Sequence, residues 1–194
     1  MDLGAWVLET ACRHFAGWKR RGCRLDYISI NVSALQLKEA GLVDTVSEIL
    51  RRHEMAPSEL QIEITESVLA EGGATDRNLR KLSALGAKLA LDDFGTGYSS
   101  LNYLRTFPID TLKIDKSFML ELPSEPAACR LVESIIRMCA ALGKDVVAEG
   151  IETQEQLDFL HSRGCWAVQG FLTGRPMNSP NVGRFMRRVP AREQ

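Results

Sequence analysis

The most constraining feature of this sequence is an alternation of short apolar runs with longer helix-like segments, repeated six times along 194 residues. The short runs have the length and the period of β-strands, and the segments between them have helical spacing. Strands that alternate with helices in this way form parallel sheets, because each connection has to cross back over the sheet. The pattern therefore predicts an α/β fold, and both a barrel and an open doubly wound sheet fit it.

We expect six strands, separated by helices and turn residues. The expected strands are Tyr27–Val32, Leu60–Thr65, Lys88–Asp92, Thr111–Asp115, Asp145–Glu149 and Cys165–Gln169. The expected helices are about Leu3–Lys19, Leu42–His53, Leu79–Leu85, Cys129–Leu142, Thr153–Arg163 and Asn181–Arg187. Thr153, followed by Gln156 three residues later, has the spacing of a capping box and predicts where its helix begins.

Each expected strand carries a polar residue near its carboxyl end, on one face. Side chains alternate across a strand, so the other face is left apolar and suits packing against helices. The polar residues are Asn31, Glu63, Asp92, Lys113, Glu149 and Gln169. One such residue would be an ordinary exposed side chain. Six such residues on six strands instead indicate that they gather at one open end, or mouth, of a barrel. The carboxyl ends of barrel strands carry the active sites of that fold, so the pattern favours a barrel.

The third strand ends in two adjacent acids, Asp92 and Asp93, which are followed by a Gly95-Thr96-Gly97 turn. Neighbouring carboxylates repel each other unless a cation lies between them, and the glycines permit a tight turn. This stretch predicts a cation site beside a loop that covers it. The alternative is a solvated turn that carries two acids.

The candidate ligands in this mouth are all oxygen donors, which suit magnesium, manganese or calcium. Several carboxylates can hold two metal ions about 3.5–4 Å apart, an arrangement that activates water against a phosphate ester. Lys113 adds a positive charge that could stabilise a phosphoryl group. A structural ion pair with a neighbouring acid is the other interpretation of Lys113.

Composition argues against several classes of function. The net charge of -1 gives no electrostatic basis for binding a nucleic-acid polymer or an acidic membrane. No apolar run approaches the ~20 residues of a membrane span, and the first residues lack a secretory signal. The five cysteines are odd in number and contain no Cys-x-x-Cys pair. They indicate reduced thiols in a cytoplasmic protein, without a disulfide framework or a zinc site.

Six segments of the chain together resemble the EAL domain family, in its order and spacing over nearly the whole length. These segments are Ile30–Ala34, Glu63–Glu66, Asp92–Leu101, Leu112–Asp115, Ala148–Thr153 and Gln169–Gly170. The resemblance implies a modified TIM-type (β/α) barrel. It also implies hydrolysis of the bacterial second messenger cyclic di-GMP to linear pGpG, with two magnesium or manganese ions.

The resemblance further implies a role for each site residue. The implied metal ligands are Asn31, Glu63, Asp92, Asp93 and Glu149. Lys113 would contact the attacking water, Glu149 would also be the general base, and Glu66 would hold a lid loop closed. The lid loop contains Phe94, Gly95, Thr96, Gly97, Tyr98 and Ser99. The residues implied to complete or support the site are Gln169, Asp115 and Glu152.

The chain departs from the family at its N-terminal side. It contains no Glu-Ala-Leu segment, which in the family lies on the second barrel strand and supplies a metal-ligating glutamate. We therefore expect residues 1–194 to form a single EAL-type domain, truncated at its N-terminus, with six of the eight strands. An incomplete barrel leaves two unpaired strand edges. Weak turnover is expected, together with low stability or pairing with a second copy.

Three functions are compatible with the sequence. A cyclic di-GMP phosphodiesterase is favoured by the intact motifs on the six strands. A non-catalytic cyclic di-GMP receptor is favoured by the missing glutamate. An aldolase with Lys113 as a Schiff-base lysine is disfavoured, because nearby acids stabilise the charged lysine. The family resemblance also suggests a homodimer, and GGDEF or sensory domains in the parent protein.

Overall fold

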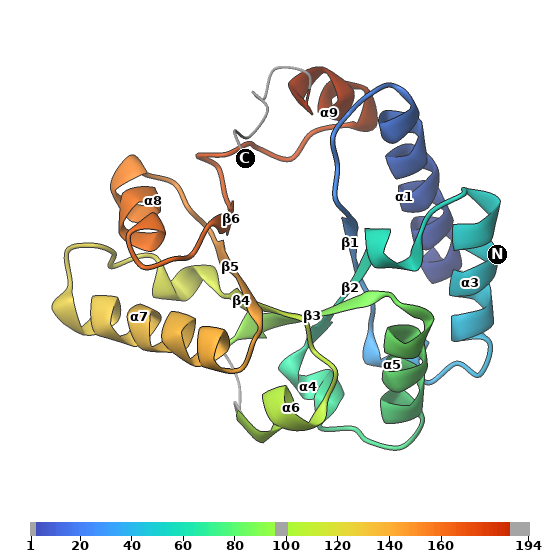
Figure 1. Cartoon of the computed structure of the whole chain (residues 1–194), viewed down its shortest axis with the longest axis horizontal. Helices are drawn as coiled ribbons and strands as arrows, with labels where there is room; N and C mark the ends of the chain where they lie inside the picture. The colour runs from blue at the N-terminus through green and yellow to red at the C-terminus, as the bar shows by residue number, and fades with distance from the viewer. Residues whose placement is uncertain (1–2, 96–100, 187–194) are drawn as a thin grey trace.

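The computed structural model describes residues 3–95 and 101–186 of the chain. Within these residues, six parallel strands form one sheet in the order β1-β2-β3-β4-β5-β6. The strands are β1 (Ile28–Asn31), β2 (Leu60–Thr65), β3 (Lys88–Phe94), β4 (Thr111–Ile114), β5 (Asp145–Glu149) and β6 (Ala167–Gln169). The sheet curls into an open half-barrel with the helices on its outside (Figure 1). The barrel prediction is therefore confirmed, with six strands in the described part of the chain.

The long helices lie where helical spacing predicted them, with ends that shift by at most three residues, except that α5 begins five residues before the expected Leu79. They are α1 (Leu3–Arg20), α3 (Leu42–Arg52), α5 (Ala74–Leu85), α7 (Pro126–Ala141), α8 (Gln154–His161) and α9 (Ser179–Met186). Most short helical segments were not predicted, because one or two turns are too brief to show a periodic pattern. They are α2 (Ala34–Leu37), η1 (Pro57–Glu59), α4 (Glu66–Leu69) and η2 (Lys116–Phe118). The short helix α6 (Leu101–Thr106) follows the Gly-Thr-Gly stretch, where the sequence favours the start of a helix.

The two faces of the sheet differ as the alternation predicted. The outer face of the central strands is apolar and at most 2% exposed, so it forms the core against the helices. Its residues are Ile62, Ile64, Leu89, Leu91, Leu112 and Ile114. The inner face carries the polar residues. The helices thus cover one side of the sheet only, which distinguishes this barrel-type sheet from a doubly wound one.

The open side of the half-barrel lies between β1 and β6, and each of these strands pairs with one neighbour in the described sheet. The segment after β6 runs across this side to α9, which lies beside α1 (Figure 1). Trp18 Nε1 on α1 donates a hydrogen bond to the Ser179 carbonyl oxygen at 3.2 Å. The first and last helices of the described chain, α1 and α9, are therefore held together outside the sheet.

The predicted capping box at the start of α8 is present. The Gln156 backbone N–H donates to Thr153 Oγ1 at 3.3 Å, and the Thr153 N–H donates to Gln156 Oε1 at 3.2 Å. This box fixes the chain directly after β5, whose last residue is Glu149. Among the described residues, every helix is too short or too polar to cross a bilayer.

Candidate active site

A β-bulge brings the adjacent acids Asp92 and Asp93 to the same mouth of the sheet. In the ladder between β3 and β4, Leu91 pairs with Leu112 and Phe94 pairs with Ile114. Two residues of β3 therefore oppose the single residue Lys113, which is the definition of a bulge. Asp93 has a φ of 52°, in the left-handed region that non-glycine residues seldom adopt.

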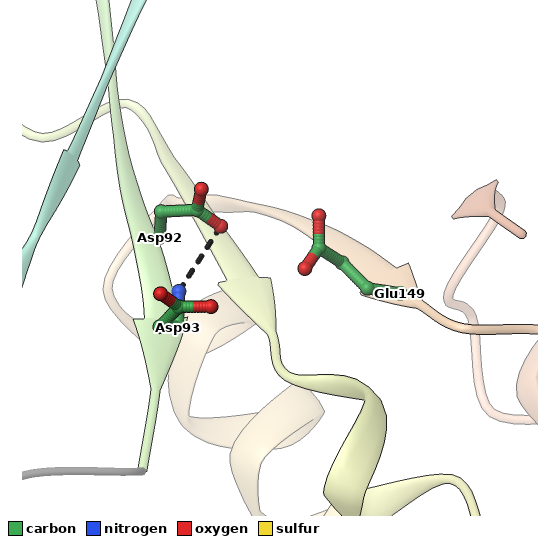
Figure 2. A group of neighbouring side chains, drawn as sticks. All are labelled: Asp92, Asp93 and Glu149. Atoms are coloured by element: carbon green, nitrogen blue, oxygen red, sulfur yellow. Dashed lines mark hydrogen bonds between the residues drawn. The ribbon is translucent and has the colours of Figure 1, made fainter. Parts of the chain in front are cut away.

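The bulge gathers three carboxylates from two strands. One oxygen each of Asp92, Asp93 and Glu149 lies within 4.8 Å of the others. Figure 2 shows Glu149, on β5, facing the two aspartates, on β3. The Asp93 N–H donates to Asp92 Oδ1 at 3.0 Å, which orients that carboxylate. The grouping predicted for these three residues is thus present in the structure.

Lys113 lies at the centre of the acids and is 4% exposed. Its Nζ is 2.7 Å from Glu149 Oε1, 2.8 Å from Glu63 Oε2 and 3.0 Å from Asp92 Oδ1. Burial lowers the pKa of Lys113, but its hydrogen bonds to the three carboxylates outweigh burial and raise the pKa above its ordinary value. The lysine is therefore charged at neutral pH, which opposes the Schiff-base interpretation because a nucleophilic amine must be neutral.

Burial and neighbouring charges raise the pKa values of two acids of the cluster, Glu149 and Asp93. Burial raises the pKa of Glu149, and the charges of Asp92 and Glu63 raise it further, against a lowering by Lys113. Burial likewise raises the pKa of Asp93, with contributions from Asp92 and Asp115. A carboxylate with a raised pKa holds a proton more readily, as suits a group that accepts one during a reaction.

A second layer of polar side chains lies beneath the acids, on the same inner face. Gln61 is 2% exposed. Its Nε2 donates to Ser29 Oγ at 3.0 Å, and its Oε1 accepts from Thr111 Oγ1 at 3.2 Å. This network joins β1, β2 and β4 directly below Glu63 and Lys113. Because buried polar groups are costly when unpaired, it fixes the spacing of the strands that carry the site.

Glu66 contacts the first part of the predicted lid loop, and its implied role in holding that loop closed stays a prediction. The Gly95 N–H donates to Glu66 Oε1 at 2.8 Å. Phe94 is buried at the end of β3, where it packs in the core. Thr96, Gly97, Tyr98 and Ser99, which were also predicted to form the lid, lie outside the described residues.

The other predicted site residues lie around the cluster. Asn31 is paired in register with Glu63, and Gln169 with Glu149, so both lie at the carboxyl ends of their strands. Asp115 follows β4, and its Oδ1 accepts a hydrogen bond from the Ser117 N–H at 2.9 Å. Burial raises the pKa of Asp115, but the hydrogen bonds from Ser117 outweigh it and lower the pKa overall.

Glu152 is exposed in the loop between β5 and α8. Its backbone N–H donates to Gln156 Oε1 at 2.9 Å. Its backbone is therefore tied to the capping box that follows Glu149. The supporting role implied for its side chain stays a prediction.

A cleft of about 550 Å³ opens on the inner face next to the cluster. Its polar lining residues include Ser29, Gln61, Glu63, Lys113 and Gln169. Small-molecule sites commonly have volumes of roughly 300–1,000 Å³. The cleft thus brings a ligand-sized space into contact with Lys113 and Glu63.

The donor set fits a hard divalent cation. The three clustered residues offer only carboxylate oxygens, and Glu63 adds another through its shared contact with Lys113. Magnesium, manganese and calcium prefer such ligands, whereas zinc sites mostly contain histidine or cysteine. Asp92, Asp93 and Glu149 are the residues placed to hold such an ion.

The alternation of strand side chains did not predict the bulge, the Gln61 network or the packing around Gly95. In a regular strand Asp93 would point away from Asp92. The adjacent acids were the signal for a common site, since two carboxylates next to each other suggest a shared partner. Gln61 lies two residues before Glu63, on the same face, which was a weaker signal.

Comparison with known proteins gives consistent results. A family model described as EAL domain matches residues 1–176. The bifunctional diguanylate cyclase/cyclic di-GMP phosphodiesterase MucR of Pseudomonas aeruginosa is 44% identical over 178 residues, which are 91% of this chain and 26% of MucR. The chain therefore spans about a quarter of the length of this curated relative.

Two solved structures illustrate the likeness in fold. The EAL domain of Mycobacterium smegmatis DcpA has a TM-score of 0.90 at 39% identity, and the match covers 97% of this chain and 86% of that one. The manganese/cyclic di-GMP complex of Klebsiella pneumoniae BlrP1 has a TM-score of 0.80 at 32% identity, covering 89% of this chain and 44% of that one. Both likenesses extend over nearly the whole chain.

Proposed function

This chain belongs to the EAL domain family, and we propose that it is a phosphodiesterase that hydrolyses cyclic di-GMP to linear pGpG. The observation that carries the proposal is the convergence of Asp92, Asp93 and Glu149 around one point. MucR, with 44% identity, is named a cyclic di-GMP phosphodiesterase. A phosphodiester substrate suits this cluster because its negative charge needs a cation between it and the acids.

Two magnesium or manganese ions are the proposed cofactors. Asp92, Asp93 and Glu149 would hold them, with Glu63 and Asn31 at the adjoining strand ends. The BlrP1 structure, a complex with manganese and cyclic di-GMP, supports this ligand class. When bound, such ions supply positive charge to the phosphate and make water a better nucleophile.

The chain's own residues would handle the proton and the charge. Glu149 would take the proton of the attacking water, since burial and its acidic neighbours raise its pKa towards the operating pH. Lys113, which contacts Glu149 at 2.7 Å, would orient that water and stabilise negative charge at the phosphorus. The water oxygen would bond to phosphorus as the P–O bond to the 3′ oxygen breaks, and the 3′ oxygen would take up a proton to leave a 3′ hydroxyl and a 5′ phosphate. Gln169, Asp115 and Glu152 are proposed to line or support the substrate site.

Turnover is proposed to be weak in this chain, because the described sheet has no strand between β1 and β6. Asn31 and Gln169 are exposed at those two edges. A site that is open on one side orients its ligands and substrate less firmly, and poor positioning slows catalysis.

We further propose that the protein acts in the cytoplasm, as a homodimer or joined to a GGDEF or sensory domain.

The test is hydrolysis of cyclic di-GMP with manganese, in which pGpG is followed by chromatography. Glu149→Gln should abolish turnover, because the variant keeps the shape of the side chain but cannot take up the proton. Glu155→Gln, at an exposed position on α8, is the matched control and should retain the activity of the unmodified chain. Equal rates for the two variants would refute the role of Glu149.

A second candidate is a cyclic di-GMP receptor without turnover, which the open side between β1 and β6 favours. In that case the nucleotide would bind with manganese present and would be recovered unchanged. Titration calorimetry next to the hydrolysis assay separates the two functions. Binding without pGpG formation would support the receptor, and pGpG formation would exclude it.

A further inference from the structure

The turn that follows β4 lies between the two strand ends that carry the acidic cluster. It contains residues 115–119 and includes η2, whose first N–H groups are capped by Asp115. Phe118, in this turn, packs partly buried against the core. Since β4 lies between β3 and β5 in the sheet, its continuation can contact both of them.

The turn contacts the end of β3 through Phe118 and Gly95. Gly95 has a φ of +95°, and a Cβ at this position would overlap the Phe118 ring, with Cε2 only 2.6 Å away. The N–H of Gly95 also donates a hydrogen bond to Glu66. The backbone two residues after Asp93 therefore contacts both an aromatic ring and a carboxylate.

The same turn contacts the end of β5. Gly150, directly after Glu149, has a φ of +71°, and a Cβ there would overlap the Lys116 side chain and lie 3.1 Å from the Lys116 Cα. Gln156 Nε2 also donates to the Met119 carbonyl oxygen at 2.8 Å, with Gln156 at 7% exposure. Both strand ends that bear the clustered acids are thus packed against one short segment.

We propose that Phe118 is a positioning residue and that the turn of residues 115–119 sets the placement of Asp93 relative to Glu149. Asp93 adopts a left-handed backbone conformation that costs free energy, and such strain persists only where the surroundings hold it. The Phe118 ring provides that support through Gly95. The link to metal binding rests on the proposed function, whereas the link to backbone order does not.

A double-mutant cycle tests the contact between Phe118 and Gly95. Gly95→Ala introduces the overlap, Phe118→Ala removes the ring, and the double variant removes the overlap again. Gly86→Ala is the matched control: its φ is +103°, and its added Cβ meets only Pro57 Cβ at 3.4 Å. The readouts are hydrogen exchange of residues 91–95 by mass spectrometry and manganese affinity by electron paramagnetic resonance.

We expect Gly95→Ala and Phe118→Ala each to speed exchange of residues 91–95 and to weaken manganese binding by about 10- to 100-fold. Alanine at position 95 keeps the strain of a φ of +95° even without the ring. The double variant should therefore bind manganese more weakly than Phe118→Ala alone, but by less than the sum of the two single effects, since coupled residues are not additive. Gly86→Ala should leave both readouts unchanged. Additive effects in the cycle, or a Gly95→Ala variant that matches Gly86→Ala, would overturn the proposal.

The β5 side is tested by Gly150→Ala against Gly143→Ala. The two glycines have φ values of +71° and +65°, but the space around Gly143 is open, so the pair separates the Lys116 contact from backbone strain. Only Gly150→Ala should speed exchange of residues 147–151, and equal exchange in the two would overturn the proposed role of the turn. The exchange readout needs no metal. A failure to bind manganese would therefore count against the proposed function alone.

Discussion

Replacing Lys113 with methionine should destabilise the metal-free protein strongly. The lysine is 4% exposed, and its Nζ contacts three carboxylates at 2.7–3.0 Å. Methionine has a similar volume and no charge. The variant would therefore leave Glu63, Asp92 and Glu149 facing one another with no cation between them.

The magnitude follows from the geometry. At an effective dielectric constant of about 20, an ion pair at 2.8 Å has a gross attraction on the order of 6 kcal/mol. Desolvation offsets most of this attraction, and removal of one partner from a buried pair costs about 3–5 kcal/mol. In a domain of this size that loss lowers the melting temperature by about 6–20 °C.

The stability lost in the Lys113→Met variant should depend on pH, and the carboxylates determine the sign of that dependence. Burial raises the folded pKa of Glu149, and the charges of Asp92 and Glu63 add to this, while Lys113 lowers it; without Lys113 the pKa of Glu149 should therefore rise further above the unfolded value. Protonation of Glu149 then favours the folded state, so the variant's loss of stability is largest at pH 7.5 and shrinks as pH falls towards 5. Urea unfolding in EDTA at both pH values measures this dependence.

Lys81→Met, at an exposed position on α5, is the control and should have little effect. A Lys113→Met variant within about 1 kcal/mol of the unmodified chain at pH 7.5 would refute the electrostatic reasoning, since surface ion pairs contribute no more than that. A deficit that grows as the pH falls would refute it equally.

Three further predictions follow from local contacts. Thr153→Ala removes the cap of α8 and should lower the free energy of unfolding by about 0.5–2 kcal/mol in urea, whereas Thr153→Ser should retain it. Glu66→Ala should slow cyclic di-GMP hydrolysis at least about tenfold by releasing the Gly95 N–H, while Glu66→Gln keeps an acceptor and most of the rate. Burial and the nearby Glu9 raise the pKa of Cys12 from 9.0 to about 12. The stabilisation from its protonated thiol should therefore be present below pH 9 and decline as pH rises towards 12, and native Cys12 should resist iodoacetamide at pH 8 by mass spectrometry.

The strands and the inner polar face were predictable because a period of two is visible in a single sequence. In β2, Gln61 and Glu63 face inwards while Ile62 and Ile64 pack outwards, as alternation requires. The same rule identified Lys113 on β4 and Glu149 on β5. Because the carboxyl ends of parallel strands all lie at the same edge of the sheet, such residues come together there independently of the loop conformations.

The local breaks in regularity were not predictable in this way. The bulge at Asp93 depends on the register between β3 and β4, which involves residues about twenty positions apart. The close approach of Gly95 to the Phe118 ring likewise involves two separate segments, and no periodic pattern in the sequence relates them. Helices of one turn, such as α4, are stabilised by their surroundings more than by their own sequence.

These breaks are also what turns the acids into a site. On a regular strand Asp92 and Asp93 would point to opposite faces, and one of them would enter the apolar layer against the helices. The bulge opposite Lys113 places both aspartates at the mouth of the barrel. In return, Asp93 adopts a left-handed backbone conformation and the regular pairing of β3 with β4 is interrupted. Contacts of Gly95 with Glu66 and with Phe118 then hold the distorted backbone. The chemistry of the cluster therefore depends on packing around Gly95 as much as on the identity of the acids.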